Sequence, residues 1–147
     1  MSTMKHTTHQ TVPLSRVEAV DKLRRHGISP TGQRVDIACL LFAAHRHLSA
    51  EQLLGDLRAH GIPVSKATVY NTLNLFTEHG LLREVIVDAA KRFYDSNLEP
   101  HHHLYHTDTG LLEDVPPAQV DLSSLPGIPS GQAILGVDVI IRVGPQR

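Results

Sequence analysis

Residues 62–76 read IPVSKATVYNTLNLF, and this stretch decides the fold. Ser65 is a typical N-cap residue, because its hydroxyl can accept a hydrogen bond from an N–H of the first helical turn. Val69, Leu73 and Phe76 follow at helical spacing and predict a helix with one apolar face. A short Gly-Ile-Pro-Val turn separates this helix from an earlier one. This is the spacing of a helix-turn-helix, with the helix from Ser65 as the candidate recognition helix.

Three further helices are predicted earlier in the chain, each opened by a residue that can cap its first turn. These caps are Ser15 with Glu18, Thr31, and Ser49 with Gln52. The two Ser pairs have capping-box spacing, in which each side chain bonds the backbone N–H of the other residue. The first helix is expected over about residues 16–26, and the third is expected to end at Gly61. The second is apolar nearly all round and is expected at the centre of the core.

A β-hairpin is predicted directly after these helices. Residues 82–87 and 92–95 are strand-like, and residues 88–91 form the turn between them. Four capped helices followed by a hairpin make a winged helix. The same pattern also fits other small α+β domains, so DNA binding does not follow from it alone.

The second part of the chain is predicted to be a small sheet. Residues 101–106 and 111–115 read as two strands joined by a turn, and residues 137–143 as a last strand with one apolar face at period two. Three short strands make a thin core. We therefore expect a second copy of the chain to complete the sheet in a homodimer.

The net charge of the 147 residues is −1, which by itself gives no sign of a nucleic-acid partner. Its distribution is uneven, because residues 14–92 hold 11 Lys and Arg against 8 Asp and Glu, whereas residues 93–147 hold 2 against 7. The basic first part of the chain can bind the phosphates of a nucleic acid, and the acidic second part can bind a cation. The longest apolar run is eight residues, far below the ~18–20 that span a bilayer, so we expect a cytoplasmic protein with no membrane partner.

A run of three histidines is the densest chemical feature. Alternate residues of a strand share a face, so His101 and His103 can point the same way with α-carbons ~6.5–7 Å apart, while His102 points to the other face. Asp95 precedes the run, and Asp114 follows the predicted turn, where it can return beside the pair. These ligands suit Fe²⁺, Mn²⁺ or Zn²⁺. The alternative is a set of surface histidines on a solvated edge strand.

No catalytic motif accompanies these ligands. The chain has no H-E-x-x-H helix, no nucleophile elbow and no Walker loop, so we expect that it is not an enzyme. A small metal-dependent hydrolase, with a site assembled from distant residues, is the alternative from another class.

Three stretches together resemble the ferric uptake regulator (Fur) superfamily of bacterial repressors: RHLSAE at 46–51, ATVYNTL at 67–73 and HHH at 101–103. The resemblance covers about residues 15–144. The chain looks most like the iron response regulator (Irr) branch because of four features: LF at 41–42, PVSKATVYNTLN at 63–74, the triple His, and DVIIR at 138–142.

The resemblance implies an α+β protein, with an N-terminal winged helix-turn-helix domain and then a small α/β dimerisation domain. We place the first domain at residues 14–95 and the second at 96–147, after a disordered tail over 1–13 that includes the solvated His6 and His9. Such a protein binds double-stranded operator DNA with inverted repeats as a homodimer.

The resemblance also implies which residues meet DNA: Arg34, Lys66, Thr68, Tyr70 and Asn71. Tyr70 and Asn71 fall where the family contacts bases, and the other three lie near backbone phosphates. A Tyr ring can pack on a thymine methyl, and Asn can pair with adenine. The alternative for Tyr70 is a packing role.

The regulatory metal site of the family falls on His47, Asp95, His101, His103 and Asp114. His47 comes from the DNA-binding domain, so an ion held with the other ligands would fix the angle between the domains. A ligand that prefers one such geometry shifts the population that is able to bind DNA.

Two departures from the family bear on cofactors. The structural zinc of many members uses two Cys-x-x-Cys pairs; the first falls on His106 and Thr109, and the second lies beyond the chain end, so no structural zinc held by four cysteines is expected. The Irr branch senses haem, for which the axial ligands here would be His101, His102 and His103, although a Cys-Pro haem motif is missing.

These observations predict a repressor of iron-homeostasis genes whose operator binding responds to a divalent metal and to haem. The first alternative is a winged-helix regulator that is independent of metal, with structural or pH-responsive histidines.

Overall fold

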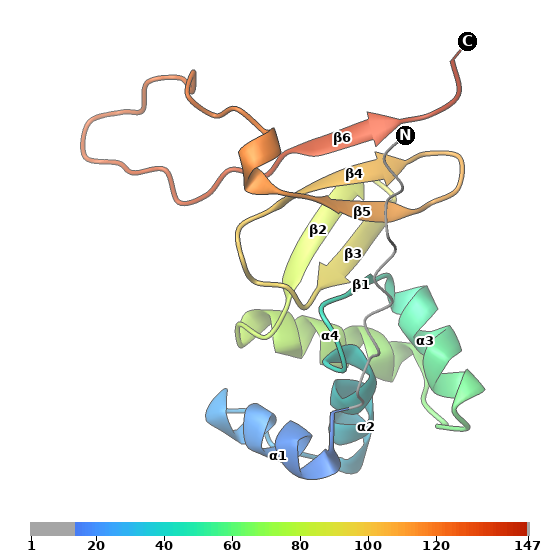
Figure 1. Ribbon diagram of the computed structural model, residues 1–147. Coiled ribbons are helices and arrows are strands. Elements are labelled where there is room, and N and C mark those ends of the chain that lie inside the picture. The colour runs from blue at the N-terminus through green and yellow to red at the C-terminus, as the bar shows by residue number, and fades with distance from the viewer. Residues whose placement is uncertain (1–13, 147) are drawn as a thin grey trace. The chain divides into compact units, whose positions relative to one another are not determined.

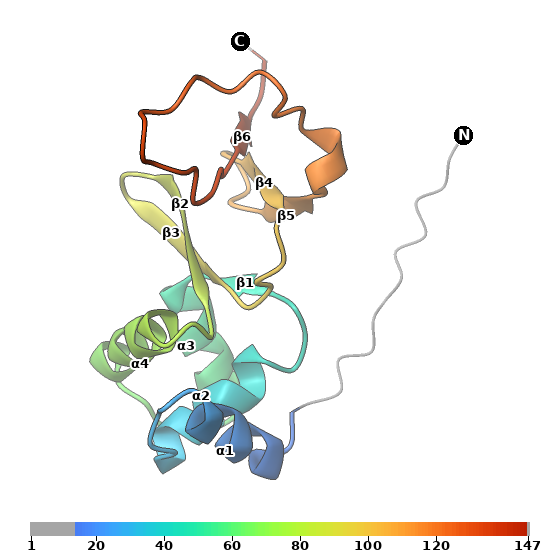
Figure 2. The same cartoon turned by 90° about the vertical axis from the view of Figure 1, so that its left-hand side faces the viewer.

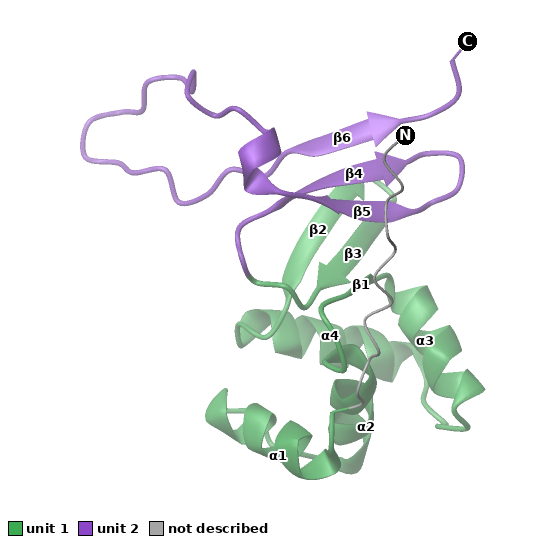
Figure 3. Ribbon diagram, viewed as in Figure 1, with its two compact units in different colours: residues 1–98 green, residues 99–147 purple. Residues whose placement is uncertain are grey.

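A computed structural model describes residues 14–146 of the protein (Figure 1). The predicted tail, with His6 and His9, lies outside the described residues. The chain divides into two compact units, residues 1–98 and residues 99–147 (Figure 3). No helix in the described part is long and apolar enough to cross a membrane.

The elements of the first unit are, in chain order, α1 (Arg16–Arg25), α2 (Gly32–Leu41), β1 (His47–Leu48), α3 (Ala50–Ala59), α4 (Lys66–Glu78), β2 (Arg83–Asp88) and β3 (Lys91–Asp95). Those of the second unit are β4 (His102–His106), β5 (Leu112–Val115), the short 3-10 turn η1 (Pro117–Gln119) and β6 (Ile140–Val143). The helices and the hairpin of the first unit form a winged helix-turn-helix domain, as predicted.

Each α-helix begins at its predicted cap. The Ser15 hydroxyl accepts the N–H of Glu18 at 3.2 Å, and the Glu18 carboxylate accepts the N–H of Ser15 at 3.0 Å. Ser49 and Gln52 form the same reciprocal pair at α3. Thr31 and Ser65 cap α2 and α4.

α1, α3 and α4 end in the same way, with a histidine and then a glycine of positive φ. At α1 the N–H of Ile28 donates to the carbonyl of Leu23 at 2.9 Å, which is the long bond of a Schellman cap. The Nδ1 of His79, which follows α4, donates to the carbonyl of His26, which follows α1, at 2.9 Å. This hydrogen bond joins the ends of the two helices.

Two glycine substitutions are expected to change stability in opposite directions. Gly27 has a φ of 74°, where a Cβ is strained, so we expect Gly27→Ala to destabilise the first unit by about 1–2 kcal/mol. Gly55 lies within α3, and a Cβ there would meet nothing within 4 Å, so Gly55→Ala should stabilise by up to ~1 kcal/mol. Urea unfolding followed by circular dichroism measures both, and changes of the same sign would contradict this account.

β1, β3 and β2 form an antiparallel sheet in that order. β2 and β3 make the predicted hairpin, which extends from the helices of the first unit (Figure 2). β1 is not predicted, because two residues show no period. It pairs with the end of β3 and places His47 opposite Asp95.

The core of the first unit lies between its four helices. α2 contributes buried residues from several sides, as its sequence predicts: Val35, Ile37, Ala38 and Leu41, each at most 1% exposed. α3 adds Leu53 and Leu57. From α4 come the three residues of the apolar face, Val69, Leu73 and Phe76. The opposite side of α4 is therefore available for other contacts.

The second unit is a three-stranded sheet with β4 in the centre. β4 runs antiparallel to β5 and parallel to β6. The chain between η1 and β6 forms a long loop (Figure 2).

The last strand differs from its prediction. β6 covers only residues 140–143 of the expected 137–143, and Ile141 on the predicted apolar face is 39% exposed. The strand starts late because the N–H of Val139 donates to the ring of His102 at 3.0 Å and so does not extend the ladder.

Candidate metal centre and DNA-binding surface

His103 lies in β4 and His101 directly precedes this strand, and their two rings lie next to each other. Their ring centroids are 4.6 Å apart, as the alternation of side chains in a strand predicts. Both residues are buried. The Nδ1 of His101 donates to the carbonyl of Glu99 at 2.5 Å, so the acceptor lone pair of the neutral ring is on its Nε2. A backbone carbonyl that fixes the ring in this way is typical of histidines that bind metal.

Asp114 reaches this pair through the β4–β5 register. It lies directly opposite His103 in the ladder. Its Oδ1 is 3.5 Å from the Nε2 of His101 and 3.6 Å from the Nε2 of His103. The Nε2 atoms of both rings therefore face the same carboxylate oxygen.

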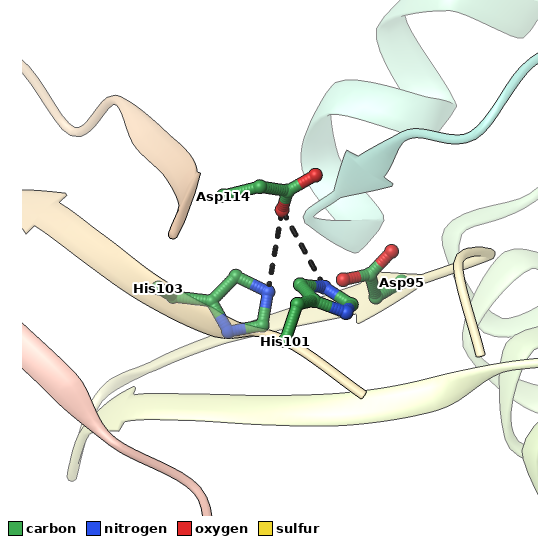
Figure 4. A group of neighbouring side chains, drawn as sticks. All are labelled: Asp95, His101, His103 and Asp114. Atoms are coloured by element: carbon green, nitrogen blue, oxygen red, sulfur yellow. Dashed lines mark ion pairs between the residues drawn. The ribbon is translucent and has the colours of Figure 1, made fainter. Parts of the chain in front are cut away.

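Asp95, the last residue of β3, completes a group of four (Figure 4). One ligand atom from each of Asp95, His101, His103 and Asp114 lies within 4.8 Å of the others. Two imidazoles and two carboxylates fit Fe²⁺, Mn²⁺ or Zn²⁺, which accept mixed nitrogen and oxygen ligands. The donor set therefore suits a divalent transition metal.

His47, the fifth predicted ligand, is not a member of this group. It lies in β1, opposite Asp95 in the ladder, and its ring packs edge-on against Phe93 with centroids 6.4 Å apart. The structure thus brings four of the five predicted ligands together and leaves His47 next to one of them in the sheet.

His102 does not join its two neighbours. It is buried, and its Nδ1 accepts the N–H of Val139 at 3.0 Å. The ring therefore holds the start of β6, and only its Nε2 is left for any other contact. The three histidines that were predicted as haem ligands do not share one face.

Three of the five predicted DNA-contacting residues surround one hollow. Arg34, Thr68 and Asn71 line a depression of ≈ 210 Å³ at the start of α2 and along α4. Thr72, which is 5% exposed, also lines it and is not singled out by the sequence. The guanidinium of Arg34 donates to the carbonyl of Ser29 at 3.0 Å, which holds the charge near the start of α2.

The other two, Lys66 and Tyr70, contact each other one turn apart on α4. The Lys66 Nζ lies 5.9 Å from the centroid of the Tyr70 ring. The Tyr70 hydroxyl donates to a carboxylate oxygen of Glu51 in the first turn of α3, at 2.5 Å. This hydrogen bond raises the pKa of Tyr70 and lowers the pKa of Glu51. Nothing in the sequence predicts the contact, because no pattern links these two helices residue by residue.

Comparison with known proteins supports the resemblance to the ferric uptake regulator family. The sequence pattern of the ferric uptake regulator family matches residues 25–124. The peroxide-responsive repressor PerR of Staphylococcus epidermidis is 29% identical over 104 residues, which are 71% of this chain and 69% of that protein.

Solved structures agree in fold. The ferric uptake regulator from Pseudomonas aeruginosa with manganese superposes with a TM-score of 0.66 and 25% identity, over 86% of this chain and 97% of that one. The Vibrio cholerae ferric uptake regulator gives a TM-score of 0.65 at 20% identity, over 86% and 98% of the two chains. The predicted resemblance is confirmed: the protein belongs to the ferric uptake regulator family, whose members are metal-responsive, DNA-binding transcription regulators and not enzymes.

Proposed function

We propose that this protein is a repressor of iron-homeostasis genes whose operator binding is controlled by a divalent metal at Asp95, His101, His103 and Asp114. The observation that carries the proposal is the set of four ligand atoms within 4.8 Å of one another. A bound divalent metal would be coordinated by both imidazoles, and its positive charge would offset the negative charges of the two carboxylates. Fe²⁺, Mn²⁺ and Zn²⁺ all accept such ligands.

We propose that α4 enters the major groove of operator DNA. Tyr70 and Asn71 would contact bases, while Arg34, Lys66 and Thr68 would contact phosphates. The support is geometric, because Arg34, Thr68 and Asn71 line one hollow beside α4 and Lys66 lies against Tyr70. Phosphate contacts of this kind give an affinity that falls as salt rises.

Two copies of the chain would bind the two halves of an inverted repeat. As a DNA-binding regulator, the protein would act in the cytoplasm. Metal and DNA would be coupled thermodynamically: a metal that binds the DNA-competent form more tightly raises the population of that form. Linkage requires DNA to raise the metal affinity by the same factor. His47, next to Asp95 in the sheet, is the residue we propose as a fifth ligand of the bound ion.

Fluorescence anisotropy on chelator-treated protein tests the proposal. The probe is a duplex enriched from a random-sequence pool by the wild-type protein in the presence of Mn²⁺. We expect the affinity for this duplex to differ by about 5- to 150-fold between the metal-free and the Mn²⁺-loaded protein. Fe²⁺ and Zn²⁺ are titrated in parallel. Equal affinities in all four states would leave a winged-helix regulator that is independent of metal.

Haem is the second effector that we propose, in line with the resemblance to the Irr branch. Its iron would take the Nε2 nitrogen of His101, because the Nδ1 of that ring donates its proton to the Glu99 carbonyl. The Nδ1 of His102 accepts the N–H of Val139, so the Nε2 of His102 carries the ring proton and would have to lose it before it could bind iron. The same titration, repeated with haem while its absorption band is recorded, tests this. A haem spectrum and a DNA affinity that both stay unchanged would remove haem from the proposal.

A further inference from the structure

α4 presents Tyr70 in an orientation that three contacts hold. The ring is half-buried and packs against the core of the first unit. The Lys66 Nζ lies 5.9 Å from the ring centroid, and the hydroxyl donates to Glu51 at 2.5 Å. A tyrosine held in this way has little rotamer freedom left to lose when it meets a partner.

Glu51 is a charged residue in an unexpected place for a DNA-binding surface. It is exposed, and its carboxylate lies at the side of the recognition helix that carries Lys66 and Tyr70. A carboxylate near DNA repels phosphate, so it weakens binding to any duplex regardless of sequence. The same carboxylate accepts the proton of the Tyr70 hydroxyl, so the part of Tyr70 that is not hydrogen-bonded to Glu51 is its uncharged ring.

We propose that Glu51 is a positioning residue for sequence reading, which fixes the Tyr70 ring for contact with a base and lowers affinity for DNA of other sequence. This inference rests on the proposed function, because it needs operator binding through α4. It assigns to Tyr70 a contact through its ring and not through its hydroxyl. It also assigns to Glu51 a role in specificity without any contact with DNA.

A double-mutant cycle between the two residues tests the inference. The measured quantity is the ratio of affinities for two duplexes, the one that wild-type protein enriches from a random pool in Mn²⁺ and a shuffled duplex of equal composition, at fixed salt. We expect Glu51→Ala to lower this ratio by about fivefold or more, which is the discrimination that one good base contact provides. Tyr70→Phe should lower it equally, because it breaks the same hydrogen bond. In the Tyr70→Phe background, Glu51→Ala should have no further effect on the ratio.

Two charge-removing variants complete the design. Glu51→Gln keeps an acceptor oxygen for the Tyr70 hydroxyl, so it should keep the wild-type ratio while both duplexes bind more tightly. Glu78→Gln removes the same charge from the far end of α4, where the side chain is exposed and distant in sequence from Tyr70. It should also leave the ratio unchanged. Thermal unfolding of each variant confirms that the fold is kept.

The proposed function and the positioning role of Glu51 fail on different results. If the wild-type protein enriches no duplex, the proposed function fails. If it does and Glu51→Ala keeps the wild-type ratio, the positioning role is wrong. If Tyr70→Phe lowers the ratio while Glu51→Ala does not, the hydroxyl itself contacts DNA. If Glu51→Ala lowers the ratio equally with Phe at position 70, Glu51 acts by another route and the inference is overturned.

Discussion

Replacing His103 with alanine is expected to weaken Mn²⁺ binding by at least about 100-fold, since loss of even an outer partner of a metal ligand costs about 10- to 100-fold. His103 is 2% exposed, and its Nε2 lies 3.6 Å from the Asp114 carboxylate that faces the proposed ion. Removal of the ring leaves one imidazole and two carboxylates, with space for water in place of the lost nitrogen. Isothermal titration calorimetry on chelator-treated protein measures the change. The same variant should bind the selected duplex with an affinity that no longer responds to Mn²⁺.

His106 offers a matched control on the same strand. Its Nε2 lies 2.7 Å from the Glu113 carboxylate, and it is not a member of the four-residue group. We expect His106→Ala to keep the wild-type Mn²⁺ affinity. Circular dichroism and thermal unfolding without metal show whether each variant keeps its fold. A loss of affinity that is equal in both variants, or absent in His103→Ala, would contradict the assignment of the site.

Replacing Phe76 with alanine is expected to cost about 3–5 kcal/mol of unfolding free energy, the range for a buried Phe that leaves a cavity. Phe76 is fully buried, and its ring lies 5.9 Å from that of Phe42. A domain is stabilised by only about 5–15 kcal/mol in total, so this one change brings the first unit close to unfolding. Urea unfolding followed by circular dichroism measures the loss, because all described α-helices belong to that unit.

The loss of unfolding free energy in Phe76→Ala arises from the cavity, and the variant keeps its contacts with DNA. Excess duplex should therefore restore part of the stability. A ligand that binds only the folded form stabilises it by mass action. Val17→Ala is the control, because Val17 is 80% exposed and such a change should stay within about 0.5 kcal/mol of wild type. A similar loss in both variants would show that burial in this core does not decide stability.

The helices could be predicted because their signals are local. A cap such as Ser65 and the apolar residues that follow it lie within one segment, so a single sequence carries the full pattern. β1 depends instead on residues far apart in the chain. The N–H of Arg46 donates to the Ser96 hydroxyl at 2.9 Å, and the N–H of Ser96 donates to the carbonyl of Arg46 at 3.0 Å. These bonds bring a two-residue strand to the edge of β3. A strand of two residues is too short to show an alternating apolar pattern, so the sequence does not predict it.

The candidate site divides in the same way. The spacing of His101 and His103 in one strand predicts their shared side, and the short hairpin predicts the return of Asp114. Local spacing says nothing of His47, which enters the prediction only through the resemblance to a family. Glu51 had no signal of either kind, because an acidic residue in the first turn of a helix is ordinary in any exposed helix. Its contact with Tyr70 depends on how two helices pack.

The sequence of the three-histidine run does not by itself fix the register of β4, because the run consists of identical residues. A slip of one position would place His102 on the side now occupied by His101 and His103, and would turn both of those rings toward the opposite face. The hydrogen bond from Val139 to His102 does not oppose such a slip, because another imidazole would take the same position. Tyr105 opposes it, because this residue is 6% exposed and alternates with His101 and His103, so a slip would turn its buried ring to the other face. Insertion of a single residue between His101 and His103 should therefore abolish metal binding although all three histidines are kept.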